Sequence, residues 1–337
     1  ADDAALGRLI TDYEIYALAQ NPIEGGQQGD RGALSRLPDN SPAADAARTS
    51  ALKAFAARTK AISPAELSEE GRINREFLGW TLERQLQSLA FDEARMPFSS
   101  DGGFHWTLGY LAASTPMRSL ADGRAWINRL NAAPAYYATE IANARRGVRT
   151  GFTQPRATVE QVLARAREQA AVPIDSDPLL TPLDQLPASI PPADRQALRA
   201  QAIAAIGERV RPAQAQFVSF LETEYLPKAR RSLAARSLPD GERYYAWLVA
   251  DHTTTSLTPD QIHENGLAEV ARIRREMDAV IAETGFKGDF AEFQAHLRSD
   301  PQFYATSRQA LLEKASEIAK RIDDQLRVRK RLPEASL

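Results

Sequence analysis

The sequence has no cysteine among its 337 residues, and its charges almost balance, with 42 Lys and Arg against 44 Asp and Glu. The absence of cysteine excludes disulfides, thiolate-bound metal and a cysteine nucleophile. A net charge of −2 provides no general attraction to nucleic acid or to an anionic membrane surface. No apolar run approaches the ~20 residues that a transmembrane helix needs. We therefore expect neither a nucleic-acid partner nor a membrane span.

Stretches rich in alanine, leucine, arginine and glutamate fill most of the sequence, and their apolar residues recur every three or four positions. Alternating patterns typical of β-strands are nearly absent. Three stretches rich in Pro, Gly, Asp or Ser interrupt the helical pattern, over residues 21–42, 94–104 and 172–191. We predict an all-α fold, an elongated array of helices that forms one wall of a cleft. An N-terminal helical region (1–190) and a C-terminal helical region (191–337) are expected to form one continuous helical domain.

Two local signals place helix boundaries. Ser63 and Pro64 are suited to the N-cap and first position of a helix that runs to residue 91. Pro212 lies inside the helical pattern of residues 192–233, where a proline should bend or divide the helix because it lacks a backbone N–H.

The stretch "DHTTTSLTPDQIHENGL" (251–267) contains His263-Glu264, the pair that begins a zinc-peptidase helix. Such a helix needs a second histidine four residues on, but Leu267 occupies that position and cannot bind metal. Thr258 and Gln261 instead match a capping box, so we predict a helix start. The apolar residues that follow at helical spacing are predicted to form a core face: Ile262, Gly266, Val270, Ile273, Met277 and Ile281.

His252 stands at the end of a predicted helix that begins after "LPDG". Two interpretations are open. The plainer one is a histidine bonded to a carbonyl at the helix C-terminus, where the dipole favours a positive charge. The functional one is a polar wall that binds substrate, formed by Tyr244, Tyr245, His252, Thr253, Thr254 and Thr255.

His105 lies between Phe104 and Trp106 and follows a flexible Gly-Gly pair. It is either part of a lid over a substrate pocket or an ordinary aromatic anchor. Four further residues could hold a peptide carboxylate or be merely solvated: Asp30, Arg31, Arg145 and Arg146.

Residues 225–304, "YLPKARRSLAARSLPDGERYYAWLVADHTTTSLTPDQIHENGLAEVARIRREMDAVIAETGFKGDFAEFQAHLRSDPQFY", resemble a bacterial family called "domain of unknown function 885". The segments "DYE", "GD", "LPD", "MPFSSDGGFHW" and "RRGVRTGFTQP" are similar to the same family. The resemblance implies a helical, commonly exported zinc metallopeptidase of the gluzincin type. Its metal-binding helix, His-Glu-x-x-x-Gly-His-His, is expected downstream, and no such segment occurs in residues 1–337. The zinc ligands and the catalytic glutamate are therefore assigned to no residue of this chain, and no cofactor is expected in it.

After "RIDDQL", relatives continue with a proline and an apolar Leu-Phe pair, whereas this sequence reads "RVRKRLPEASL". We expect a truncation, a cut polypeptide or a reading error at this point. The opening "ADDAALG" would suit a chain whose signal peptide has been removed, so a periplasmic or secreted location is expected.

These observations predict the N-terminal, all-α half of an exported zinc-metallopeptidase-like hydrolase acting on peptides or small amides. Alone it should be inactive, and its partner would be the missing C-terminal half or a second copy. The alternative is a self-contained helical binding or scaffolding module. Hydrolysis by Asp251 and His252 without metal is least favoured, because adjacent residues on a helix do not face one another.

Overall fold

The computed structural model describes residues 2–329 and divides the chain into two compact units, Ala1–Thr255 and Ser256–Leu337. The boundary suggested by the sequence, between residues 190 and 191, lies inside the first unit. It does so because one hydrophobic core takes Leu183 and Leu198 from the two sides of that boundary. Most of the basic "RVRKRLPEASL" end falls on residues 330–337, outside the described residues.

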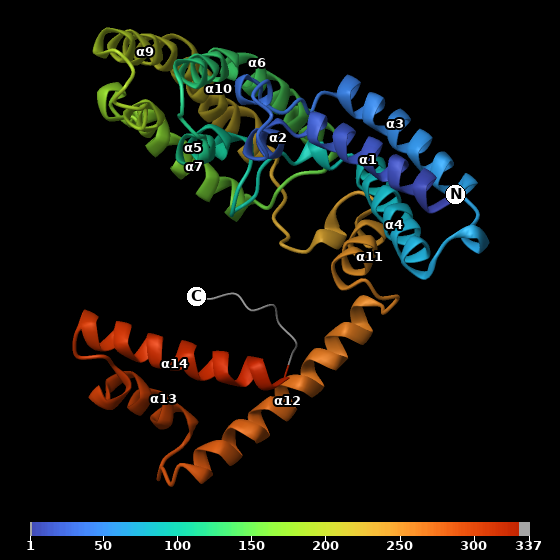
Figure 1. Cartoon of the computed structure of the whole chain (residues 1–337), viewed down its shortest axis with the longest axis vertical. Helices are drawn as coiled ribbons and strands as arrows, with labels where there is room; N and C mark the ends of the chain where they lie inside the picture. Colours follow the sequence, from blue (N-terminus) through green and yellow to red (C-terminus); the bar gives the residue numbers. More distant parts are fainter. Residues whose placement is uncertain (1, 330–337) are drawn as a thin grey trace. The chain divides into compact units, whose positions relative to one another are not determined.

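The described residues form helices, short helical turns and two isolated β-bridges, which confirms the all-α prediction. None of these helices is long and apolar enough to cross a membrane. The helices of the first unit (Figure 1) are α1 (Asp2–Gln20), α2 (Pro22–Gln27), α3 (Pro42–Ala61), α4 (Glu69–Phe91), α5 (Thr107–Ser114), α6 (Leu120–Thr150), α7 (Arg156–Ala171), α8 (Thr181–Asp184), α9 (Pro192–Ala205), α10 (Arg211–Phe220) and α11 (Gly241–Thr253). Those of the second unit are α12 (Pro259–Glu283), α13 (Phe290–Ser299) and α14 (Arg308–Arg329).

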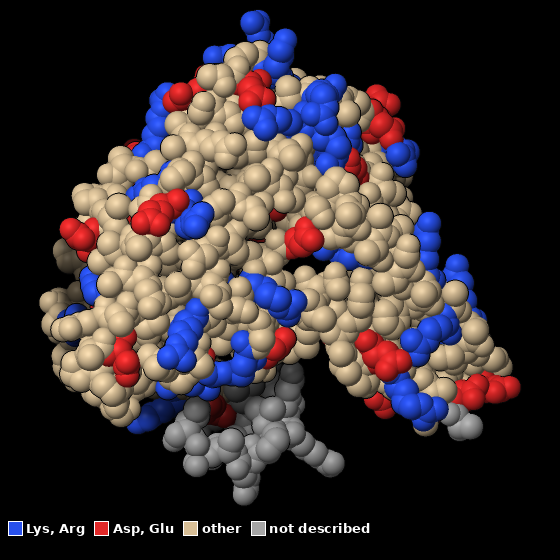
Figure 2. All heavy atoms as spheres, turned by 90° about the horizontal axis from the view of Figure 1, so that it is seen from above, with Lys and Arg blue, Asp and Glu red and all other residues tan. Residues whose placement is uncertain are grey.

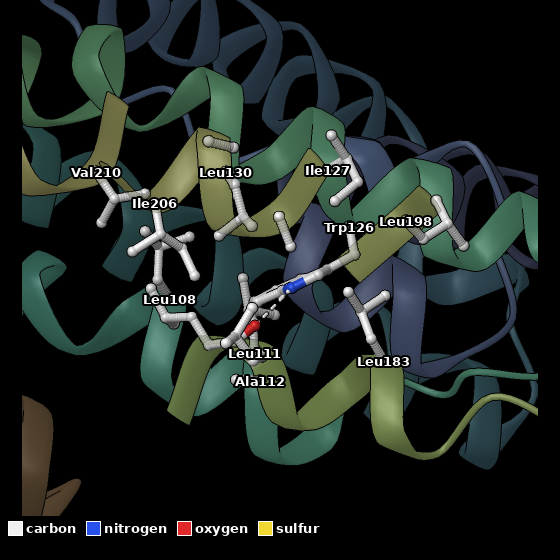
Figure 3. Close-up of a cluster of buried hydrophobic side chains, with 14 of the residues drawn as sticks. Leu108, Leu111, Ala112, Trp126, Ile127, Leu130, Leu183, Leu198, Ile206 and Val210 are labelled. Carbon is white, nitrogen blue, oxygen red and sulfur yellow. Dashed lines mark hydrogen bonds between the residues drawn. The ribbon is translucent and has the colours of Figure 1, made fainter. Parts of the chain in front are cut away.

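Helix α6 is the central element of the first unit and packs against α9 and α10. Trp126 of α6 is fully buried, and its indole Nε1 donates a hydrogen bond of 2.9 Å to the Leu179 carbonyl. Figure 3 shows this bond inside the surrounding leucine and isoleucine side chains. The bond satisfies the polar atom of the indole while the ring fills the core, so α6 is anchored along its N-terminal half.

The C-terminal half of α6 lies in a second core that is rich in aromatic rings. Tyr137 and Phe104 meet edge to face at 5.1 Å, and Phe104 meets Phe217 of α10 at 4.7 Å. This cluster fixes the 94–104 stretch against α6 and α10, because Phe98 and Phe104 are both buried in it.

Arg129, also on α6, is buried with 1% of its surface exposed and has no carboxylate partner among the described residues. Its guanidinium donates to the carbonyls of Arg36 (3.0 Å), Ala33 (3.0 Å) and Pro22 (3.4 Å), and to Thr115 Oγ1 (3.2 Å). Burial lowers the pKa of Arg129 to about 10, so the group remains charged at neutral pH. Arg129 therefore holds the irregular 21–42 stretch against α6.

Of the two predicted helix boundaries, the one at Ser63 was wrong and the interruption near Pro212 is confirmed. Ser63 begins only a short helical turn, Pro64–Glu66, and α4 starts at Glu69, where Ser68 accepts a bond from the Gly71 N–H. The prediction of an N-cap at Ser63 was therefore wrong by one turn, because a second serine offered a cap with the required bond. Pro212 follows a π-helical segment, Ile206–Val210, which interrupts the long helix as expected.

The capping box at the start of α12 is confirmed. The Gln261 N–H donates to Thr258 Oγ1 at 3.2 Å, and the Thr258 N–H donates to Gln261 Oε1 at 2.9 Å. The predicted core face of α12 was wrong, because only Ile281 on this helix is buried. Ile273 and Met277 are each 43% exposed and line a shallow apolar groove with α13 instead.

Thr258→Ala should cost about 1 kcal/mol of α12 stability, because the Gln261 N–H loses the hydroxyl that accepts its hydrogen bond. Amide hydrogen exchange in the first turn of α12 should become correspondingly faster. Thr258→Ser keeps the hydroxyl and should retain most of the protection. Unchanged exchange in Thr258→Ala would show that the cap contributes nothing in this setting.

Candidate functional site

A cavity of about 400 Å³ in the first unit takes its ionisable lining from α3, from α6 and from the turn that follows α4. We call it the carboxylate cavity. Its charged lining consists of Asp45, Arg48, Asp92, Glu93 and Glu140. Neutral polar groups come from Asn40, Ser88, Thr107 and Tyr136. The remaining walls are formed by Leu89, Ala94, Pro97 and Phe104.

Two of the four carboxylates are neutralised within the protein. Asp45 pairs with Arg48 at 2.5 Å. Asp92 accepts two bonds from Arg146, at 2.6 and 3.0 Å, and lies 3.3 Å from Arg95. Asp92 also ends α4 in a left-handed conformation (φ 53°), so the chain turns sharply just before Glu93.

Glu93 has no basic partner among the described residues. It accepts hydrogen bonds from Ser88 Oγ and, at 2.7 Å, from the hydroxyl of Tyr244 on α11. Burial, followed by the hydrogen bond and the negative charge of Glu93, raises the pKa of Tyr244, so this tyrosine stays a proton donor at neutral pH. The carboxylate of Glu93 is thus positioned by two hydroxyls and forms no ion pair with a described residue.

Glu140 is the most deeply buried acid of the cavity, with 1% of its surface exposed. Its Oε1 accepts a 2.7 Å bond from Asn40 Nδ2, across 100 residues of sequence. Burial raises the pKa of Glu140 above its usual value. The charges of Asp45 and Asp39 act in the same direction, against the hydrogen bonds of Asn40 and Asn143. Glu140 and Glu93 are thus two carboxyl groups of the cavity without a basic partner among the described residues, and a positively charged ligand group would stabilise their ionised forms.

No group of three or more His, Asp or Glu lies close enough together within residues 2–329 to hold a metal ion. The zinc implied by the family resemblance thus fits no set of described residues, and no catalytic step is assigned through it.

Charges of both signs are scattered over the face drawn in Figure 2, as expected from the balanced composition.

The residues predicted to form a polar wall do not line this cavity. Tyr244 is buried behind Glu93, whereas Tyr245 is 43% exposed. His252 is 74% exposed, and its Nδ1–H donates to the Leu248 carbonyl at 2.8 Å, which agrees with the helix-end interpretation. Thr253 and Thr254 likewise donate to backbone carbonyls, at 2.8 and 2.7 Å. Substrate binding by these residues stays a prediction.

His105 lies in the aromatic core, with 2% of its surface exposed and its ring centroid 5.5 Å from that of Phe217. Its buried Nδ1 has no hydrogen-bond partner among the described residues. Burial and, to a lesser degree, the positive charge of Arg165 lower the pKa of His105 to about 4. This environment agrees with the aromatic-anchor interpretation, although the neighbouring Phe104 reaches the cavity wall.

The arginines considered as carboxylate binders are engaged in ion pairs. Arg31 pairs with Asp122, Arg145 with Glu224 and Arg146 with Asp92.

Glu93 and Glu140 were not predicted from the sequence as residues of the site. One signal was present for Glu140, since it falls between Tyr136 and Ala144 at a spacing of four, in the middle of the buried stripe of α6.

A family model described as "Bacterial protein of unknown function (DUF885)" matches residues 22–337, and the chain belongs to this family. The resemblance seen in the sequence is thereby confirmed. No curated protein matches the chain.

Among solved structures, the chain is similar to "the putative lipoprotein from Colwellia psychrerythraea", with a TM-score of 0.83 and 19% identity. The match covers 96% of this chain and 59% of that one. The chain thus spans about three-fifths of the length of that protein, and at this identity the likeness shows the fold alone.

Proposed function

We propose that this chain supplies the substrate-binding helices of an exported, zinc-metallopeptidase-like hydrolase that acts on peptides or small amides. The reaction class comes from the family resemblance, which implies zinc ligands and a catalytic glutamate outside residues 1–337. The chain alone is then inactive. Export is supported by the similarity to a protein described as a lipoprotein.

The carboxylate cavity is the observation that supports this proposal. Its volume of about 400 Å³ falls within the range of small-molecule sites, roughly 300–1,000 Å³. Hydroxyl, amide and carboxylate groups converge on it from α3, α4, α5 and α6, from the turn after α4 and from the 21–42 stretch, and Phe104 and Leu89 add apolar surface. Such a mixture of surfaces suits a short peptide, which has both polar and apolar groups.

A self-contained binding module is the second candidate. It is favoured by the fact that the cavity is lined entirely by residues between 40 and 140, so its walls need no other segment.

Co-expression separates the two functions. The chain should be produced with the downstream segment of a relative that contains His-Glu-x-x-x-Gly-His-His, and assayed on dipeptides and small amides. We expect hydrolysis by the pair that a zinc chelator abolishes, and none by either part alone. A pair in which the histidines of that segment are replaced by alanine is the control. A folded pair that binds peptides without hydrolysing them would contradict the hydrolase and favour the binding module.

A further inference from the structure

The buried carboxylates of the first unit differ in whether an arginine pairs with them. Asp122 pairs with Arg31, and Asp177 accepts a 2.6 Å bond from Arg211. Glu140 is equally buried, yet no Lys or Arg pairs with it among the described residues. Burying a carboxylate without a positive partner is costly, and the cost is larger where neighbouring charges have the same sign.

The setting of Glu140 points to a ligand as the missing partner. Unlike Asp122 and Asp177, it lines a cavity of about 400 Å³, where Glu93 is a second carboxylate without a basic partner. The Thr107 and Tyr136 hydroxyls bond to one another at 3.1 Å and line the same space. A primary ammonium group has three donors, and these walls provide carboxylate and hydroxyl oxygens to accept them.

We propose that the carboxylate cavity binds the free amino group of a short peptide or aminoalkyl amide, with Glu140 as the counter-ion and Glu93 as the second carboxylate. This assignment of the substrate class rests on the proposed function, but the binding step needs only residues of the first unit. Phe104, Leu89 and Pro97 contact the aliphatic part of the ligand.

The test is calorimetric titration of the full chain with alanyl-alanine amide and with its N-acetyl analogue. The two ligands differ in the charged amino group, and neither has a carboxylate. We expect the free amine to bind about tenfold or more tightly than the acetylated analogue, because a charge-assisted contact is lost in the latter. Glu140→Gln keeps the side-chain size and an acceptor for Asn40, and should remove this preference.

Stability distinguishes a ligand site from a structural role. Since Glu140 is buried without a counter-ion, Glu140→Gln should leave the melting temperature unchanged or raise it. Glu93→Gln should also weaken the preference for the free amine. It provides the same test if Glu140→Gln does not fold. Glu160→Gln, an exposed acid outside the cavity, is the matched control and should bind like the original chain.

Equal affinity for the two ligands, no binding of either, or an amine preference retained in both folded glutamine variants would each overturn the proposal. These outcomes are separate from the hydrolase test. Loss of the amine preference leaves chelator-sensitive hydrolysis possible, and a failure of hydrolysis leaves binding to the chain alone measurable.

Discussion

Arg129→Met should lower the free energy of unfolding of the first unit by about 3–5 kcal/mol. The methionine can fill the apolar space, but the Arg36 carbonyl loses the guanidinium donor, and the Ala33 carbonyl keeps only its bond from the Arg36 N–H. A hydrogen bond made by a charged group contributes about 1.5–3 kcal/mol, and Arg129→Met removes four such bonds. The effect should extend to the carboxylate cavity, because Asn40 follows the segment that Arg129 holds and bonds to Glu140.

Urea unfolding followed by tryptophan fluorescence measures this effect in the correct unit, since all four tryptophans lie within residues 80–247. Arg124→Met is the matched control, because Arg124 is exposed on the same helix and its loss should change stability by ~0.5 kcal/mol or less. Arg129→Lys keeps the positive charge but lacks the planar guanidinium, whose N–H groups reach several acceptors at once, and should also be destabilising. A loss below ~1 kcal/mol in Arg129→Met would show that the 21–42 stretch is held by other contacts.

Lowering the pH from about 7 to about 4 should remove roughly 3 kcal/mol of stability through His105 alone. Its folded pKa of about 4 lies below the ordinary value of 6.5, so the unfolded chain binds the proton more readily between these values. The stabilisation is complete above pH 6.5 and is lost as the pH falls to about 4. Glu140 acts in the opposite direction, because its pKa is raised in the folded state.

His105→Phe should therefore make the urea midpoint less sensitive to pH between 6.5 and 4, whatever its stability at pH 7. His263→Ala, which changes an exposed histidine of α12, should keep the full dependence. The comparison uses the difference between each variant and the original chain, so that the carboxylates common to all of them cancel. An unchanged slope in His105→Phe would mean that His105 is not buried as a neutral ring in solution.

Features that depend on neighbours within one helical turn were predictable from the sequence. The Thr258 capping box and the bond from His252 to Leu248 span three and four residues, so their partners are visible in the sequence itself. The Ser63 error arose at the same short range, where Ser63 and Ser68 both offered a hydroxyl and only one met a free N–H.

The sequence by itself determined the helical class, through the spacing of apolar residues, and the family, through its motifs. Only the tertiary structure decided where the units divide, which histidine is buried and which carboxylates of the cavity lack a basic partner. Asn40 reaches Glu140 across 100 residues and Tyr244 reaches Glu93 across 151. Local periodicity contains no information about such pairings, because burial and charge compensation depend on which helices pack together.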